Sequence, residues 1–412
     1  MLRYNYREIL LKIAGLLVLI AFFSIFYPRG YITTAGGIAI VLGIVATGSL
    51  TQLHAYRHHW PMWFALLLAA MFYIGSLYSV LPLAEASQTA DKYLWLVYTI
   101  LLIPVWSVRF NKPAWQTYAY YAFLLGCVTV AVASTLRFYN LPNYSYLFVD
   151  EGFVRDESIM PFAAFLALQM VADSPRARCL PLIIFSFLSF EILYISHQRT
   201  SYIAYFLLLI LFIIQRFNCI NLKQWILTAG LMALGAIAVY HYSPTFNNGL
   251  QNLVSDAQQY NVGNYYTSSG DRAIMAKYSL KIWQQHPLFG AGTGSYGTAY
   301  NALQGPDVFE CSGTGTCDMR GGVTHPHNEF AFIAAQLGSV GLILFVGLLL
   351  SLWAYSYRLP QLQRYLLQGL VLGFAFGCCT GDLLLNDKTR YWFVTFMGLL
   401  SFSQLKNTEK SV

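Results

Sequence analysis

Residues 327–357 read HNEFAFIAAQLGSVGLILFVGLLLSLWAYSY and contain one acidic residue and no lysine or arginine. A helix that crosses a bilayer needs about 20 mostly apolar residues, so this stretch is long enough to span one. Similar apolar stretches follow one another along the chain. They predict twelve membrane-spanning helices, at about 9–27, 31–50, 61–81, 93–108, 113–134, 158–173, 179–196, 200–215, 224–243, 327–357, 365–381 and 390–405.

The composition of the 412 residues supports the same fold class. Only 10% of them are charged and 57% are hydrophobic, whereas an ordinary soluble domain is about 25% charged. This excludes a cytosolic enzyme, a secreted disulfide scaffold and a disordered chain. We therefore expect an all-α, polytopic helical bundle in which 1–412 form a single integral membrane domain.

The basic residues indicate how the bundle is oriented. They concentrate in the loops on the side of the two termini. Because cytoplasmic loops are enriched in lysine and arginine, both termini are predicted to be cytoplasmic. The formal net charge of +7 thus reflects membrane topology, and we expect the bilayer, and no nucleic acid, as a partner.

The longest loop, 244–326, is predicted to form a cap on the outer face between spans nine and ten, with short helices in it. Long loops on a rigid scaffold often carry function. A helix is predicted over 271–286, ended by Pro287. Cys311 and Cys317 flank a Gly-rich turn, and in an oxidising compartment a local disulfide between them is expected.

Two arginines of the outer face are candidates for anion binding. Arg272 is predicted in the first turn of the loop helix, where free N–H groups attract anions; the alternative is an ion pair with Asp271 or another loop acid. Arg199 is predicted in a very short outer hairpin, and the alternative there is contact with phospholipid headgroups. Guanidinium groups bind phosphate oxyanions with two hydrogen bonds, so the pair suits a diphosphate.

His325 and His327 stand where the long loop re-enters the membrane. An imidazole there can act as a general base near neutral pH; the alternative is a pair of interfacial histidines bonded to backbone carbonyls. Gly338 and Gly341 are expected to let another helix approach closely. A last charged cluster, at the outer end of the final hairpin, either neighbours the same site or marks the interface: Asp382, Asp387, Lys388 and Arg390.

The sequence carries no Asp-x-Asp motif for a metal-bound nucleotide-sugar, no P-loop and no Cys/His spacing typical of zinc. We therefore expect no metal and no cofactor. A substrate at the outer membrane face has no ATP to use and has to arrive activated. A lipid-linked diphosphate meets that requirement.

The run His327-Asn328, followed after nine residues by Gly338-x-x-Gly341, resembles the histidine motif of the O-antigen ligase and polymerase superfamily. That superfamily also contains bacterial protein O-oligosaccharyltransferases. Arg199, and Arg272 ahead of a Gly-x-Gly-x-Gly turn, resemble the two important arginines of the family. Twelve spans with the long loop between the ninth and tenth fit the ligase branch best.

The resemblance implies a GT-C-like bundle in the bacterial inner membrane with its active site facing the periplasm. It also implies transfer of an O-antigen glycan from undecaprenyl diphosphate to a sugar hydroxyl of lipid A–core, with inversion at the transferred sugar. His327 would be the base, and Arg199 and Arg272 would bind the diphosphate. Supporting roles would fall to His325, Asn328, Lys388 and Arg390.

Three other functions remain open from the sequence. An O-antigen polymerase uses the same donor, but commonly has two substantial periplasmic loops. A protein O-oligosaccharyltransferase tends to carry extra soluble sequence near its C-terminus. A secondary transporter or flippase would show repeat-related halves and midplane charges on several helices, whereas the candidate charges here gather on one outer face.

Overall fold

A computed structural model describes residues 2–27, 29–47, 56–139, 158–173, 178–196, 198–216, 239–262, 267–303 and 323–403, with the isolated positions 230, 235 and 237. Every regular element in these residues is a helix, which confirms the all-α prediction. The predicted disulfide partners Cys311 and Cys317 lie outside the described residues, as does most of the predicted span 224–243.

The helices of the first half are α1 (Leu2–Phe23), η1 (Ser24–Phe26), α2 (Arg29–Thr47), α3 (Trp60–Leu77), α4 (Leu83–Tyr93), α5 (Trp95–Leu101), α6 (Ile103–Val108), α7 (Pro113–Phe138), α8 (Ile159–Asp173) and α9 (Cys179–Phe190). The remaining helices are η5 (Glu191–Ile195), α10 (Arg199–Arg216), α12 (Pro244–Asn261), α13 (Ser268–Gln285), α14 (Tyr296–Leu303), α15 (Glu329–Ser356), α16 (Gln361–Thr380) and α17 (Asp387–Phe402).

Seven of these helices are long and apolar enough to cross a membrane: α1, α2, α3, α7, α10, α15 and α16. Helices also lie at the predicted spans 158–173, 179–196 and 390–405, where they are shorter. The predicted span 93–108 is divided into α5 and α6, because Pro104 has no N–H to continue the backbone ladder. Twelve spans and the sides on which the loops lie remain predictions.

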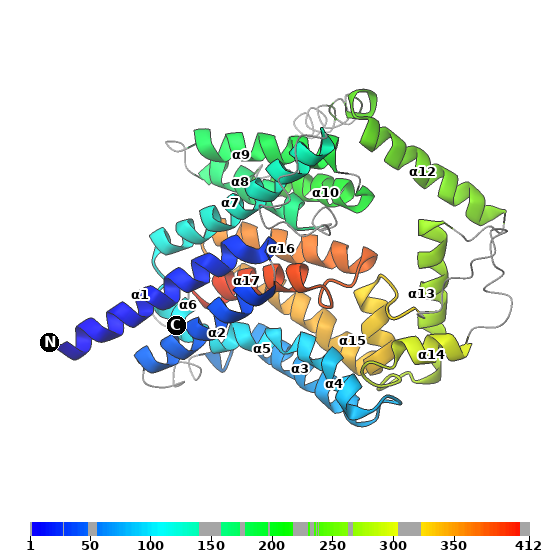
Figure 1. The fold of residues 1–412 in the computed structure, drawn as a ribbon, viewed down its shortest axis with the longest axis horizontal. Helices are drawn as coiled ribbons and strands as arrows, with labels where there is room; N and C mark the ends of the chain where they lie inside the picture. The colour runs from blue at the N-terminus through cyan, green and yellow to red at the C-terminus, as the bar shows by residue number, and fades with distance from the viewer. Residues whose placement is uncertain are drawn as a thin grey trace.

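The centre of the bundle is occupied by α17, the last helix, with α1 and α16 beside it (Figure 1). Phe396 of α17 makes edge-to-face contacts with Phe22, Phe123 and Phe162, whose ring centres lie 5.1, 4.8 and 4.9 Å away. These four rings come from four helices and are almost completely buried. Such aromatic pairs add about 0.5–1.5 kcal/mol beyond their buried area, so they help to fix α17 in the centre.

The loop helices α12, α13 and α14 lie together at one end of the molecule (Figure 1). The predicted loop helix is present as α13, and Tyr278 and Ile282 on its expected apolar stripe are buried. They form a second core with Tyr300 of α14 and Phe332 of α15. Packing of the loop helices therefore fixes α13 beside the start of α15.

Helix α15 is broken at Gly338, which has the left-handed dihedral angles φ 63° and ψ −159°. A Cβ atom here would lie 2.3 Å from the backbone carbon of Leu288, so glycine is required. The sequence predicted that Gly338 and Gly341 admit another helix. That was wrong for Gly338, which admits the turn at residues 287–289 of the long loop, and Gly341 packs against Leu337 and Ile333 of its own helix.

The loop completes the hydrogen bonds that the break leaves open. In an unbroken helix Ala335 and Gln336 would accept from Ser339 and Val340. Instead, the two carbonyl oxygens accept from the backbone N–H groups of residues 291 and 292 at 2.9 Å. The N–H groups of Ser339 and Val340 donate to the carbonyls of residues 287 and 288 at 2.8 and 3.2 Å. Four backbone hydrogen bonds thus join the loop to α15.

Candidate functional site

The segment that precedes α15 presents the predicted histidines. His327 is the one non-glycine residue with a positive φ, 51°, in the described part of the chain. The next residue, Asn328, caps the helix, because its Oδ1 accepts from the N–H of Ala331 at 2.9 Å. Its Nδ2 donates to the carbonyl of Cys379 at 3.1 Å. Asn328 therefore both starts α15 and fastens it to the end of α16.

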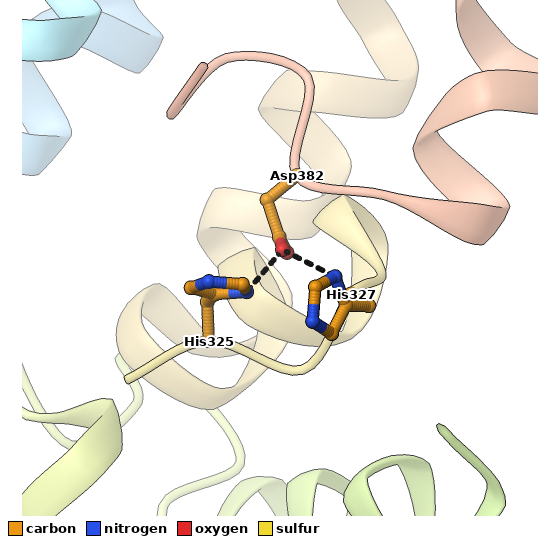
Figure 2. Close-up of side chains that lie close together, drawn as sticks. All are labelled: His325, His327 and Asp382. Atoms are coloured by element: carbon orange, nitrogen blue, oxygen red, sulfur yellow. Dashed lines mark ion pairs between the residues drawn. The ribbon is translucent and has the colours of Figure 1, made fainter. Parts of the chain in front are cut away.

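His325, His327 and Asp382 converge at this point (Figure 2). Oδ2 of Asp382 lies 2.6 Å from Nδ1 of His325 and 3.9 Å from Nδ1 of His327. The Asp382 side chain is 5% exposed, whereas those of His325 and His327 are 37% and 46% exposed. A buried carboxylate thus orients one imidazole directly and stands close to a second that remains open to a substrate.

Burial lowers the pKa of His327 from its ordinary value of 6.5, and the neighbouring imidazole of His325 lowers it further. The carboxylate of Asp382 acts in the opposite direction, and the cation of Arg272 adds to the lowering. The neutral imidazole is the form that accepts a proton. At neutral pH, His327 is therefore in the state that a general base requires.

Glu329, the first residue of α15, is fully buried. Its Oε1 accepts from the hydroxyl of Tyr93 at 2.5 Å, and its Oε2 accepts from the N–H of Leu384 at 3.0 Å. Its own N–H donates to the carbonyl of Gly381 at 3.2 Å. These bonds hold the segment that carries Asp382 against the start of α15.

The predicted supporting residues Lys388 and Arg390 differ in their positions. Arg390 is 1% exposed, and its Nη1 donates to the carbonyls of Leu384 and Leu385 at 2.7 and 3.2 Å. Its Nη2 pairs with Asp387. Arg390 therefore braces the 384–387 turn from inside the protein, and neither Arg390 nor Lys388 is among the described residues that line the pocket below.

Arg199 is the first residue of α10, and its guanidinium pairs with a carboxylate of the loop helices. Its Nη1 lies 3.0 Å from Oδ2 of Asp256 on α12, and the same oxygen accepts from Oγ of Ser269 on α13 at 2.9 Å. Partial burial raises the pKa of Asp256, but the hydrogen bonds from Arg199 and Ser269 outweigh it and leave this pKa below its ordinary value. The ion pair ties α10 to the loop helices.

Arg272 is the fifth residue of α13, since the helix begins at Ser268 and is capped by Thr267. The sequence placed it in the first turn with the helix start at Asp271; the helix in fact begins three residues earlier because the Thr267 side chain accepts from the N–H of Gly270 at 3.0 Å. Arg272 nevertheless acts electrostatically on His327, so these two predicted site residues are brought together.

A pocket of about 550 Å³ opens beside the two histidines and Asp382. Thr89 and Lys92 of α4 form part of its wall, and Gly294 of the Gly-x-Gly-x-Gly turn at 290–294 forms another part. Its remaining polar lining comes from Ser158, Thr324, Asn386 and Thr389. Hydroxyl, amide and charged groups around one cavity are suited to a polar ligand with many hydroxyl groups.

The group of two imidazoles and one carboxylate also resembles a ligand set for a transition metal, since its candidate ligand atoms all lie within 4.8 Å of one another. Two ligands of one tetrahedral zinc ion lie about 3.4 Å apart, given metal–ligand bonds of about 2.0–2.1 Å. The 2.6 Å between His325 and Asp382 is shorter. The geometry present is that of a direct contact between an imidazole nitrogen and a carboxylate oxygen.

Comparison with known families gives one result. The O-antigen ligase family model matches residues 184–346, which contain Arg199, Arg272, both histidines and the broken first half of α15. This match supports the predicted resemblance of the chain to the O-antigen ligase superfamily. No curated protein sequence matches the chain.

The match suggests glycosyl transfer of the ligase or polymerase type, and together with the apolar helices it suggests a multi-pass membrane protein. The matched region ends before Asp382 and begins after Lys92, so both of these groups lie outside it. Sequence reasoning noted Asp382 only within a charged cluster and missed Glu329, Asp256 and Lys92. An acidic residue at the head of an otherwise apolar span was the available signal for Glu329.

Proposed function

We propose that this protein is an O-antigen ligase, which transfers an O-antigen glycan from undecaprenyl diphosphate to a sugar hydroxyl of lipid A–core. The observation that carries the proposal is the half-exposed His327, whose pKa is lowered beside Asp382 and a polar pocket. A neutral base next to space for a sugar suits the activation of a hydroxyl group.

In the proposed reaction, Nε2 or Nδ1 of His327 takes the proton of the acceptor hydroxyl as its oxygen attacks the anomeric carbon of the donor sugar. The bond between that carbon and the diphosphate oxygen breaks, and the electron pair leaves with undecaprenyl diphosphate. One displacement of this kind inverts the anomeric centre. The leaving group is already activated, so the step uses neither ATP nor a metal ion.

Arg272 is the proposed contact for the leaving diphosphate, because its charge already reaches His327. Arg199 is the second proposed contact, held by Asp256 at the junction of α10 and the loop helices. Each guanidinium can offer two hydrogen bonds to phosphate oxygens. Preorganised cations of this kind typically lower a barrier by several kcal/mol.

The ligase function is preferred to that of a polymerase because the sequence predicts a single long loop on the outer face. The two differ in the acceptor, which is lipid A–core in a ligase and a growing glycan in a polymerase. The bacterial inner membrane and a periplasmic active site are part of the same proposal.

The proposal is tested by deleting the gene, separating the lipopolysaccharide of the deletion strain on a gel and measuring its lipid-linked glycans. A ligase predicts core without O-antigen and long glycans accumulating on undecaprenyl diphosphate. Core that bears a single repeat unit would instead identify a polymerase. An unchanged lipopolysaccharide ladder would refute both functions.

A further inference from the structure

The pocket beside His327 contains a buried hydroxyl that the described protein does not satisfy. Ser158 is 1% exposed, and its Oγ has no hydrogen-bond partner among the described residues. A buried polar atom without a hydrogen bond is costly, so this hydroxyl indicates a ligand that can form a hydrogen bond with it. Asp382 adds a buried carboxylate to the same lining, and its Oδ2 contacts Nδ1 of His325.

Part of the pocket wall is formed by α4. Thr89 and Lys92 are three residues apart and therefore share one face of this helix. Gly294 fixes the position of α4, since a Cβ there would lie 3.3 Å from the Cα of Ala86. Neither Arg199 nor Arg272 is among the described residues that line the pocket, so its cationic wall is contributed by Lys92.

We propose that this pocket is the acceptor subsite, which holds the acceptor sugar of the transfer reaction. The proposal rests on the proposed function. Asp382 accepts hydrogen bonds from hydroxyl groups of the sugar, the Ser158 hydroxyl donates to or accepts from them, and Lys92 binds the anionic substituent of the sugar. The arginines remain for the diphosphate of the donor, so His327 stands between the two substrates and faces the hydroxyl that reacts.

The test uses the full-length protein in proteoliposomes, with lipid-linked glycan as donor and lipid A–core as acceptor. Ser158→Ala removes only the hydroxyl, and Lys92→Met removes only the charge. We expect the KM for the acceptor to rise about threefold to tenfold for the first variant and roughly tenfold or more for the second. The KM for the donor is expected to stay unchanged.

Two control variants make the same kinds of change at residues outside the pocket. Ser76→Ala removes a buried hydroxyl that donates to its own helix at the carbonyl of Phe72, and Lys277→Met removes an exposed lysine of α13. Both should leave the KM for the acceptor unchanged. A rise in the donor KM with Ser158→Ala would assign the pocket to the donor sugar, and no change in either KM would also overturn the proposal.

A second readout separates this subsite from the proposed reaction. A benzophenone amino acid in place of Thr89 should form a photo-crosslink to lipid A–core, whereas the same group in place of Lys277 should not. A crosslink without any glycan transfer by the wild-type protein would support the subsite and contradict the proposed function. Transfer without a crosslink from position 89 to the acceptor would contradict the subsite alone.

Discussion

The hydroxyl of Tyr93 lies 2.5 Å from Oε1 of Glu329, although the two residues are 236 positions apart. The bond joins the end of α4 to the start of α15, which carry two walls of the candidate site. Both groups are buried. Their contact therefore determines how far the α4 wall stands from the histidines.

Tyr93→Phe should destabilise the protein, because it leaves Oε1 of Glu329 buried without its donor. A lost hydrogen bond to a buried group of this kind costs about 1–3 kcal/mol. Thermal unfolding in detergent measures the effect, with Tyr98→Phe on the neighbouring helix α5 as the control. A Tyr93→Phe variant as stable as the wild type would show that Glu329 does not depend on this bond.

His327→Ala should lower the transfer rate by roughly 10²–10⁴, the usual contribution of a general base. Folding should be intact, because the side chain is 46% exposed. His325→Ala should have a smaller effect, since this imidazole contacts Asp382 and acts on His327 indirectly. Initial rates in proteoliposomes at equal protein content compare the two, and wild-type turnover by His327→Ala would rule out the proposed base.

The pH dependence of transfer should follow the neutral form of His327. Because burial lowers its pKa, the rate should fall only as the pH drops below about 6.5. Asp382→Asn removes a charge that raises this pKa, so the fall should move to still lower pH. His325→Gln removes a group that lowers it, so the fall should move to higher pH. Shifts of the two variants in the same direction would contradict this assignment.

Arg272→Ala should reduce transfer by roughly 10²–10³, as loss of one preorganised charge contact does in other enzymes. Arg272→Lys should also be impaired, because lysine lacks the planar fork that binds two oxygens. Lys277→Ala, an exposed change on the same helix, serves as the control. Full activity of Arg272→Lys would argue against two-hydrogen-bond recognition of the diphosphate.

Gly338→Ala should destabilise the protein by about 1–3 kcal/mol, because alanine is strained at φ 63°. The new Cβ would also press on the backbone of Leu288. Thermal unfolding should show the loss, together with faster proteolysis of the 244–326 loop. Gly36→Ala on α2, where a Cβ would meet nothing within 4 Å, is the matched control.

The pattern of apolar residues was sufficient to predict most of the helices, since the length of an apolar stretch and the positions of prolines are local properties of the sequence. The predicted positions of His327, Arg199 and Arg272 at outer ends of helices, together with the resemblance to the family motif, singled out these three residues. The sequence could not pair residues that are distant in the chain. The contact of His325 with Asp382 spans 57 positions and depends on how α15 packs against α16.

The same limit applies to Gly338 and to the α4 wall. Two glycines in a span suggested a neighbouring helix, and the pattern alone does not distinguish a helix from a turn of a loop as the partner. Lys92 lies beside the predicted start of a span, where a basic residue is ordinary. Only the packing of α4 against the turn at 290–294 makes Lys92 part of the pocket wall.

The backbone pairing between residues 287–292 and the break in α15 also affects biosynthesis and engineering. The ribosome makes residues 287–292 before 335–340, so the loop has to wait for α15 to be synthesised before it acquires its partner. Folding of the cap is thereby coupled to insertion of the tenth predicted span. A chimera that exchanges the loop with that of a relative should therefore carry the first half of α15 with it.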